Sequence, residues 1–114
     1  MNLEAYAALV HEVGDDPAFV AGVVDEYLAS SPEILEGMRA AVRANQPADL
    51  ARLAHTLKSS SASLGADRLA ELCQQIELSA RSGTIGGQVG ERFHQLEAEI
   101  ERVHQALQVL AAQQ

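Results

Sequence analysis

His55 is the side chain of this sequence that is best placed for chemistry at a protein surface. On a helical wheel of about 100° per residue, the apolar positions of the surrounding segment gather on one side and predict a buried stripe. The stripe consists of Leu50, Leu53, Ala54, Leu57, Ser61 and Leu64. His55 falls well away from it, so we expect the imidazole to be exposed. The outer positions around the imidazole carry small side chains, namely Ala48, Ala51, Ser59 and Ala62.

Small neighbours and a nearby cation suit a histidine that exchanges a charged group with a partner protein. Bulky side chains would keep the partner's backbone away from the ring, whereas Ala and Ser allow it to approach. Arg52 and Lys58 each lie about one helical turn from His55. A phosphoryl group on the ring would carry about two negative charges, and the Lys58 ammonium could neutralise part of them without a bond that must later break. On spacing alone, however, a surface histidine is usually only a solvated side chain.

A longer motif around His55 separates it from an ordinary surface histidine. The segment from His55 to Gly65 has the sequence HTLKSSSASLG. It resembles the signature of histidine-containing phosphotransfer domains, commonly written H-x-L-K-G-S-S-x-x-L-G, and departs from it only at Ser59, where the signature has glycine. The likeness continues through residues 68–77 and, more loosely, through residues 19–44 and the final helix. It covers most of the chain and implies a helical bundle that acts in a two-component phosphorelay.

The resemblance implies a role for each residue of the motif. His55 would accept a phosphoryl group on a ring nitrogen from the aspartate of a response-regulator receiver domain, and a second receiver would later remove it. Lys58 would be the neighbour that stabilises the phosphate. The receiver would supply Mg²⁺ and most catalytic groups, so we expect this chain to be a carrier without a bound cofactor rather than an enzyme. Ser59 could hinder close approach slightly or donate a hydrogen bond to the phosphate, and both interpretations stay open.

Glu77 is a further candidate, on the helix predicted to follow the motif. It shares a face with Gln74 and Arg81, beside an apolar stripe. In the resembled family the matching position often holds the far ring nitrogen of the histidine, which would fix the ring's tautomer and raise its basicity. Alternatively, Glu77 and Arg81 form an ordinary i,i+4 surface pair worth only about 0.3–0.5 kcal/mol. The sequence leaves both hypotheses open.

The expected docking surface surrounds His55, as in a modest, transient interface. Its apolar part would come from Ala48, Ala51 and Ala62, and Arg52 and Lys58 would lie at its polar margin. Ser59 and Arg81 are also expected to contact the partner. The rival hypothesis is a helical interaction module that binds a receiver or an enzyme and regulates it by occupancy without carrying phosphate. The sequence does not say which receivers are partners or whether the chain is free-standing or ends a hybrid sensor kinase. We expect a monomer, with the oligomeric state left open.

Helix signals divide the chain into the elements that must position these residues. Two segments, Asp15-Asp16-Pro17 and Ser31-Pro32-Glu33, each place a capping side chain before Pro at a first helical position. Apolar spacing nevertheless continues across Pro32, so one kinked helix and two helices both fit. Further helices are predicted over residues 3–13, 48–64, from residue 67, and from residue 89 onward. The pattern predicts an all-α fold in a single domain, residues 1–114: an antiparallel four-helix bundle with a short additional N-terminal helix.

Composition excludes several classes of function. The formal net charge is −8 and no basic run occurs, which argues against nucleic acid and anionic membranes as partners. No segment approaches the roughly 20 apolar residues of a membrane span. The single cysteine, Cys73, excludes an internal disulfide and is expected in the core. The start of the chain lacks a secretion signal, so we expect a cytoplasmic protein.

Other chemistry is poorly supported by the residue spacing. His11, His94 and His104 are not spaced as metal ligands, and no carboxylate or cysteine completes a set. The glycines between residues 83 and 90 lack the Lys-Ser/Thr ending of a phosphate-binding loop. We therefore expect no metal site, no ATP site and no self-phosphorylation.

Overall fold

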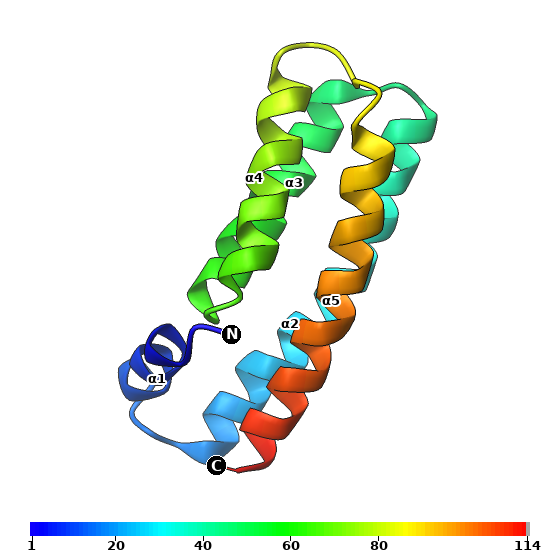
Figure 1. Ribbon diagram of the computed structural model, residues 1–114. Helices are drawn as coiled ribbons and strands as arrows, with labels where there is room; N and C mark the ends of the chain where they lie inside the picture. The colour runs from blue at the N-terminus through cyan, green and yellow to red at the C-terminus, as the bar shows by residue number, and fades with distance from the viewer. Residues whose placement is uncertain (114) are drawn as a thin grey trace.

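Five helices make up the part of the chain that the computed structural model describes, residues 1–113 (Figure 1). They are α1 (Leu3–Glu12), α2 (Pro17–Arg43), α3 (Pro47–Ser63), α4 (Asp67–Arg81) and α5 (Val89–Ala112). The four longer helices form an antiparallel bundle, and α1 lies at the end where α3 turns into α4 (Figure 1). No strand occurs within residues 1–113. The predicted four-helix bundle with a short N-terminal helix is confirmed.

Helix α2 continues without interruption through Pro32, which settles the question that the sequence left open. It begins where predicted, because the Asp16 side chain accepts a hydrogen bond from the Ala18 N–H at 3.0 Å and Pro17 occupies the first turn. Pro32 has no N–H to donate to the preceding turn, but it lies on the exposed side of the helix. Buried residues on both sides of it, such as Tyr27 and Leu35, keep the two halves packed on one core.

The core is aliphatic and follows the stripes that the sequence predicted. Leu50, Ala54 and Leu57 of α3 are fully buried, as is Cys73 of α4, which confirms its expected place in the core. In helix α5, apolar residues recur at alternating steps of four and three, the a/d pattern of helices that pack along their length. Six of them are buried: Val89, Phe93, Leu96, Ile100, Val103 and Leu107. Leu53 is only partly buried, because it lies at the edge of the α3 stripe.

The turn between α3 and α4 is attached to the start of the chain. Gly65 has a φ of +84°, and its carbonyl accepts a hydrogen bond from the Asn2 N–H at 2.7 Å. The Asn2 side chain caps α1 through the Ala5 N–H and donates to Asp67 at 2.8 Å. A Cβ atom on Gly65 would collide with the Asn2 carbonyl oxygen. Glycine is therefore required here both by the backbone conformation and by close approach.

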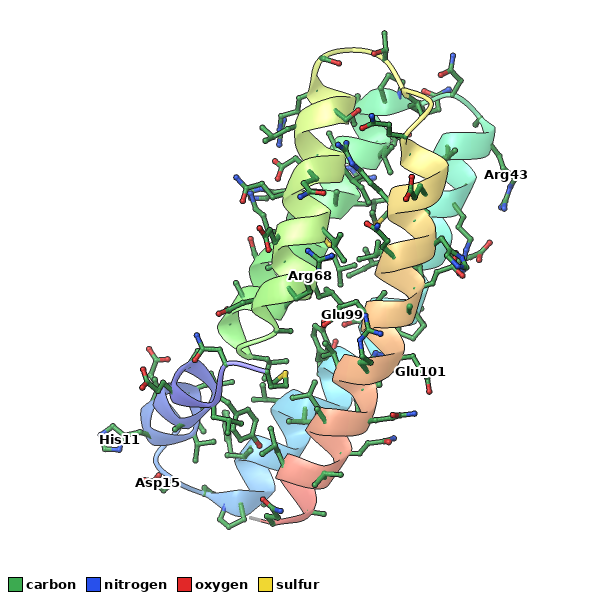
Figure 2. The ribbon with its side chains drawn as sticks, in the orientation of Figure 1. His11, Asp15, Arg43, Arg68, Glu99 and Glu101 are labelled. Atoms are coloured by element: carbon green, nitrogen blue, oxygen red, sulfur yellow. The ribbon has the colours of Figure 1, made fainter. Side chains whose placement is uncertain are left out.

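Among the described residues, charged side chains lie on the outside of the bundle except that of Glu77, which is buried. His11 on α1, Asp15 just after α1, and Arg43 at the opposite end all point outward (Figure 2). Within residues 1–113, none of the helices combines the length and the apolar composition that crossing a bilayer requires.

Candidate functional site

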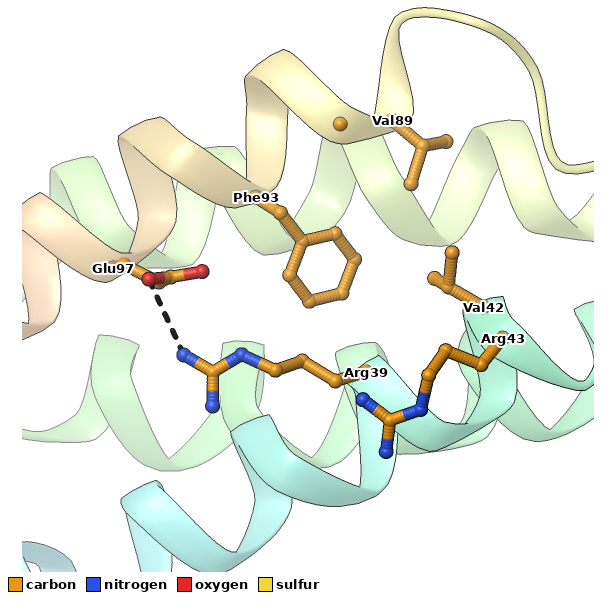
Figure 3. A pocket seen from close by; sticks show the side chains of 7 residues that line it. Arg39, Val42, Arg43, Val89, Phe93 and Glu97 are labelled. Atoms are coloured by element: carbon orange, nitrogen blue, oxygen red, sulfur yellow. Dashed lines mark ion pairs between the residues drawn. The ribbon is translucent and has the colours of Figure 1, made fainter.

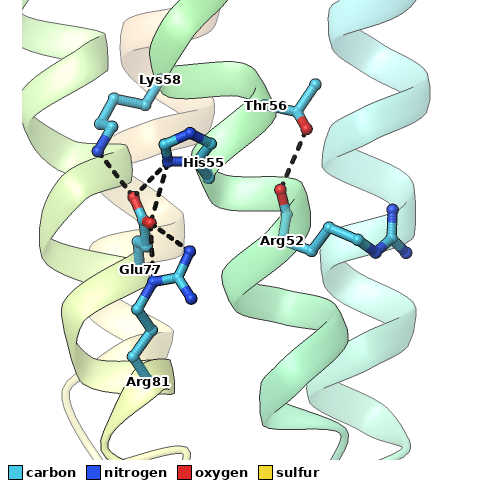
Figure 4. A network of polar contacts seen from close by, with 6 residues as sticks. All are labelled: Arg52, His55, Thr56, Lys58, Glu77 and Arg81. Carbon is cyan, nitrogen blue, oxygen red and sulfur yellow. Dashed lines mark hydrogen bonds and ion pairs between the residues drawn. The ribbon is translucent and has the colours of Figure 1, made fainter.

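His55 lies on α3 at the side that faces α4, and 53% of its side chain is exposed. Its Nδ1 atom is 3.1 Å and 3.3 Å from the two carboxylate oxygens of Glu77 on α4 (Figure 4). An ionised carboxylate can only accept hydrogen bonds, so Nδ1 carries the proton of this contact. The neutral ring then has its lone pair on Nε2. The imidazole is therefore held on one side and available for chemistry on the other.

Glu77 is the buried centre of a polar cluster, with only 6% of its side chain exposed. The Lys58 ammonium lies 2.8 Å from Oε1, and the Arg81 guanidinium contacts Oε2 through Nη2 at 2.7 Å and Nε at 2.9 Å (Figure 4). Burial raises the pKa of the Glu77 carboxyl, but hydrogen bonds from Lys58 and Arg81, with the attraction of the nearby cations, lower it to about 2. Glu77 is therefore ionised at neutral pH.

Both hypotheses for Glu77 describe part of this arrangement. The i,i+4 pair with Arg81 exists, but it is not an ordinary surface pair because the carboxylate is buried. The same carboxylate also contacts His55 and Lys58, which come from a different helix. This is the geometry that the orienting role requires, and the role itself stays a prediction.

The small residues around His55 do not all lie where the wheel put them. Ala48, Ser59 and Ala62 are exposed as expected. Ala51 was predicted on the outer surface, and this is wrong because only 3% of it is exposed. Helix α3 packs against both α2 and α4, so its buried side is wider than one apolar stripe and includes Ala51.

The two arginines of the expected docking surface differ in their surroundings. Arg52 points away from the Glu77 cluster (Figure 4), and its nearest carboxylate is Asp49, at 3.9 Å. Arg81 belongs to the cluster, although 56% of its side chain is exposed. The sequence suggested a contact of Glu77 with His55 and, as the alternative, a pair of Glu77 with Arg81, and the structure contains both. It did not suggest the contact of Lys58 with Glu77.

Sequence analysis missed one exposed apolar side chain beside the site. Leu78 follows Glu77 on α4, and 61% of it is exposed. A large aliphatic residue outside the apolar stripe of α4 is the sequence signal that could have identified it, because such residues on a surface often serve partner binding.

Elsewhere the described residues hold little that suggests a ligand. Within residues 1–113, no three His, Cys, Asp or Glu side chains are grouped as a metal site requires. A hollow of about 220 Å³ lies between α2 and α5, over Phe93 (Figure 3). Its Arg39 is paired with Glu97 at 3.3 Å and with Glu36 at 3.1 Å. None of the residues that line it belongs to α3 or α4.

Known families and solved structures resemble this chain in sequence and fold. The family model of the Hpt domain matches residues 22–106. The crystal structure of histidine-containing phosphotransfer protein B (HptB) from Pseudomonas aeruginosa PAO1 is similar, with a TM-score of 0.85, 28% sequence identity, and 97% of this chain and 93% of that chain covered. The HPT domain from the Hpt sensor hybrid histidine kinase from Shewanella shares the fold, with a TM-score of 0.75, 21% identity, and coverage of 96% and 93%.

A search among curated proteins found no match. The family model nevertheless covers most of the chain, and the histidine of the motif lies on the outer face of the bundle. This chain therefore belongs to the Hpt domain family, whose members carry a phosphoryl group on histidine in two-component phosphorelays.

Proposed function

We propose that His55 is the phosphoacceptor of this Hpt domain and that Nε2 is the atom that is phosphorylated. The observation that supports this most directly is the contact of Nδ1 with Glu77, at 3.1 Å, because it leaves the lone pair on the other nitrogen. The exposed, small side chains of Ala48, Ser59 and Ala62 leave room for a receiver domain to approach.

The bond changes of the transfer step involve only the ring and the incoming aspartyl phosphate. The Nε2 lone pair attacks phosphorus in line, the bond from phosphorus to the aspartyl oxygen breaks, and aspartate leaves as a carboxylate. Nδ1 keeps its proton, so the ring becomes positively charged while it holds the dianionic phosphoryl group. The Glu77 carboxylate stabilises this positive charge, as a carboxylate stabilises an imidazolium in hydrolytic triads. Transfer to a second receiver is the reverse of these bond changes.

Lys58 supplies the second electrostatic contribution. It lies one turn along α3 from His55, and its ammonium is already at the site, 2.8 Å from Glu77. A cation beside the phosphoryl group offsets the charge that builds up on its oxygens. Lys58 thus lowers the cost of placing a dianion next to buried Glu77.

The partner in this proposal is a response-regulator receiver domain that docks over the α3 and α4 face. Ala48, Ala62 and Leu78 provide its apolar contacts, and Ser59 lies beside the ring. In this proposal the receiver provides the Mg²⁺, and this chain is a carrier without an ATP site of its own. Residues 1–114 form a single carrier domain, which acts as a monomer in the cytoplasm. These assignments rest on the family's reaction and on the sequence patterns.

The test is transfer of radiolabelled phosphate from a phosphorylated receiver to the wild-type chain, to His55→Gln and to His94→Gln. His94 is an exposed histidine on α5, so its variant is the matched control. We expect acid-labile, alkali-stable label on the wild type and on His94→Gln, and none on His55→Gln.

Two results would contradict the proposal. Label that persists on His55→Gln would assign the phosphate to another residue. Binding without label on the wild type, by a receiver that phosphorylates a control Hpt domain, would favour the interaction module instead.

A further inference from the structure

The two cations of the cluster hold different oxygens of one buried carboxylate. Lys58 contacts Oε1 of Glu77 at 2.8 Å, whereas Arg81 contacts Oε2 twice, at 2.7 Å and 2.9 Å. The Arg81 contacts stay within α4, while the Lys58 contact crosses from α3 to α4 (Figure 4). The carboxylate is therefore paired with two cations, one from each helix.

This double pairing matters because Lys58 has a second task in the proposed reaction. Before transfer its ammonium is bound to Glu77, yet it must neutralise the phosphoryl group on His55 afterwards. A buried carboxylate that loses its only cation is strongly destabilised. The ring becomes a cation on phosphorylation and stays in contact with Glu77, but it carries the dianionic phosphoryl group itself and so does not neutralise the carboxylate in place of Lys58. A further cation must therefore stay with Glu77 when Lys58 leaves Oε1, and among residues 1–113 Arg81 is in contact to do so.

We propose that Arg81 is a positioning residue for phosphotransfer, which keeps Glu77 neutralised and in place so that Lys58 is free to turn to the phosphoryl group. This inference rests on the proposed function of His55. The chemistry of the two side chains fits the division of roles. A guanidinium makes several hydrogen bonds in a fixed geometry and suits a permanent contact, whereas an ammonium on a flexible chain exchanges partners easily.

The alternative role of Arg81 is direct contact with the receiver, as the sequence alone indicated. Its side chain is 56% exposed, so a partner could reach it. The two roles differ in what they require of Glu77. A positioning residue acts through the Glu77 charge, whereas a contact residue acts whether that charge is present or not.

The first experiment measures single-turnover transfer from a phosphorylated receiver to Arg81→Gln, Glu77→Gln and the double variant. We expect Arg81→Gln to slow saturated transfer roughly tenfold, because it removes a charge-assisted pair with Glu77. The half-saturating receiver concentration should stay unchanged. In the Glu77→Gln background the same substitution should have no further effect, and Arg81→Lys should restore part of the rate. Arg68→Gln is the matched control, because it removes the same charge from the exposed side of α4.

The second experiment follows Lys58 directly, since it is the only lysine in the sequence and gives a single side-chain NMR signal. We expect this signal to move when the wild-type chain is phosphorylated and to move less than half as far in Arg81→Gln. Circular dichroism of each variant verifies that the bundle is folded.

Three results would overturn the inference. The first is an equal shift of the Lys58 signal in the wild type and in Arg81→Gln. The second is an equal loss of rate on Arg81→Gln with and without the Glu77 charge. The third is a rise in the half-saturating receiver concentration while the saturated rate is unchanged. Each is informative only while the wild type is labelled and His55→Gln is not. Absence of label on the wild type would instead be a failure of the proposed function.

Discussion

At the scale of the residue, the site combines an exposed nucleophile with a buried carboxylate. Half of the His55 side chain is open to solvent, while Glu77 is almost wholly covered. Exposure gives a receiver access to Nε2, and burial strengthens the hydrogen bond and the ion pairs of Glu77 because water competes with them less. The cluster can therefore orient the ring without covering it.

The ionised state of Glu77 should make the stability of the bundle depend on pH in acid. The pKa of this carboxyl falls from its ordinary 4.5 to about 2 in the folded chain, as hydrogen bonds from Lys58 and Arg81 outweigh the opposing effect of burial. Below pH 4.5 the unfolded chain binds a proton that the folded chain does not, so this stabilisation is complete above pH 4.5 and is lost as the pH falls towards 2. Glu77→Gln removes it.

We expect the free energy of unfolding of Glu77→Gln to be lower than that of the wild type at pH 7, with the difference narrowing between pH 4.5 and 2. Urea unfolding followed by circular dichroism across this range measures it. Glu71→Gln, at an exposed carboxylate on the same helix, is the control and should keep the wild-type pH profile. A difference that is as large at pH 2.5 as at pH 7 would show that Glu77 does not supply this stability.

The sequence identified part of the site because that part is contiguous. His55 and Lys58 stand in one motif on one helix, so the periodicity of α3 alone places them together. Arg81 is linked to His55 and Lys58 only through Glu77. That link depends on how α4 packs against α3, which the periodicity of one helix does not show. Ala51 was misplaced for the same reason, because a helical wheel does not show how many neighbours a helix has.

At the scale of the element, the turn at Gly65 aligns the two helices that carry the site. At about 1.5 Å per residue, His55 and Glu77 lie about 15 and 18 Å along their helices from this turn. They therefore reach the same level of the bundle. The hydrogen bond of Gly65 with Asn2, at 2.7 Å, also ties this turn to α1. Helix punctuation predicted the break at Gly65 but not its contact with the start of the chain, which is remote in sequence.

Gly65→Ala should destabilise the bundle by about 1–3 kcal/mol, because it adds both backbone strain and a collision with the Asn2 carbonyl. Gly83→Ala is the matched control: Gly83 has a similar φ of +91°, but a Cβ there meets nothing within 4 Å. Urea unfolding should show the larger loss for Gly65→Ala, and hydrogen exchange in α1 should become faster only in that variant. Equal losses would mean that the contact with Asn2 contributes nothing.

At the scale of the whole molecule, the bundle is an elongated body of 43 × 20 × 18 Å (Figure 1). Apolar periodicity was sufficient to predict this architecture, since the stripe of α3 is buried as expected except for partly buried Leu53. Helices α3 and α5 each pack on both α2 and α4. The α3 and α5 surfaces are therefore on different sides, and one receiver that docks over His55 leaves the α5 surface open.

This arrangement predicts that a bulky substitution slows phosphotransfer when it is on the α3 surface and not when it is on the α5 surface. Ala62 is exposed on α3, seven residues and about two turns from His55, so the indole of Ala62→Trp should prevent close docking. We expect transfer from a phosphorylated receiver to slow at least roughly tenfold, while the free energy of unfolding changes by no more than about 0.5 kcal/mol, as for most surface substitutions. Ala98→Trp places the same indole on the exposed side of α5 and should leave the rate unchanged. Normal transfer to Ala62→Trp, or equal slowing by both, would mean that the receiver docks elsewhere.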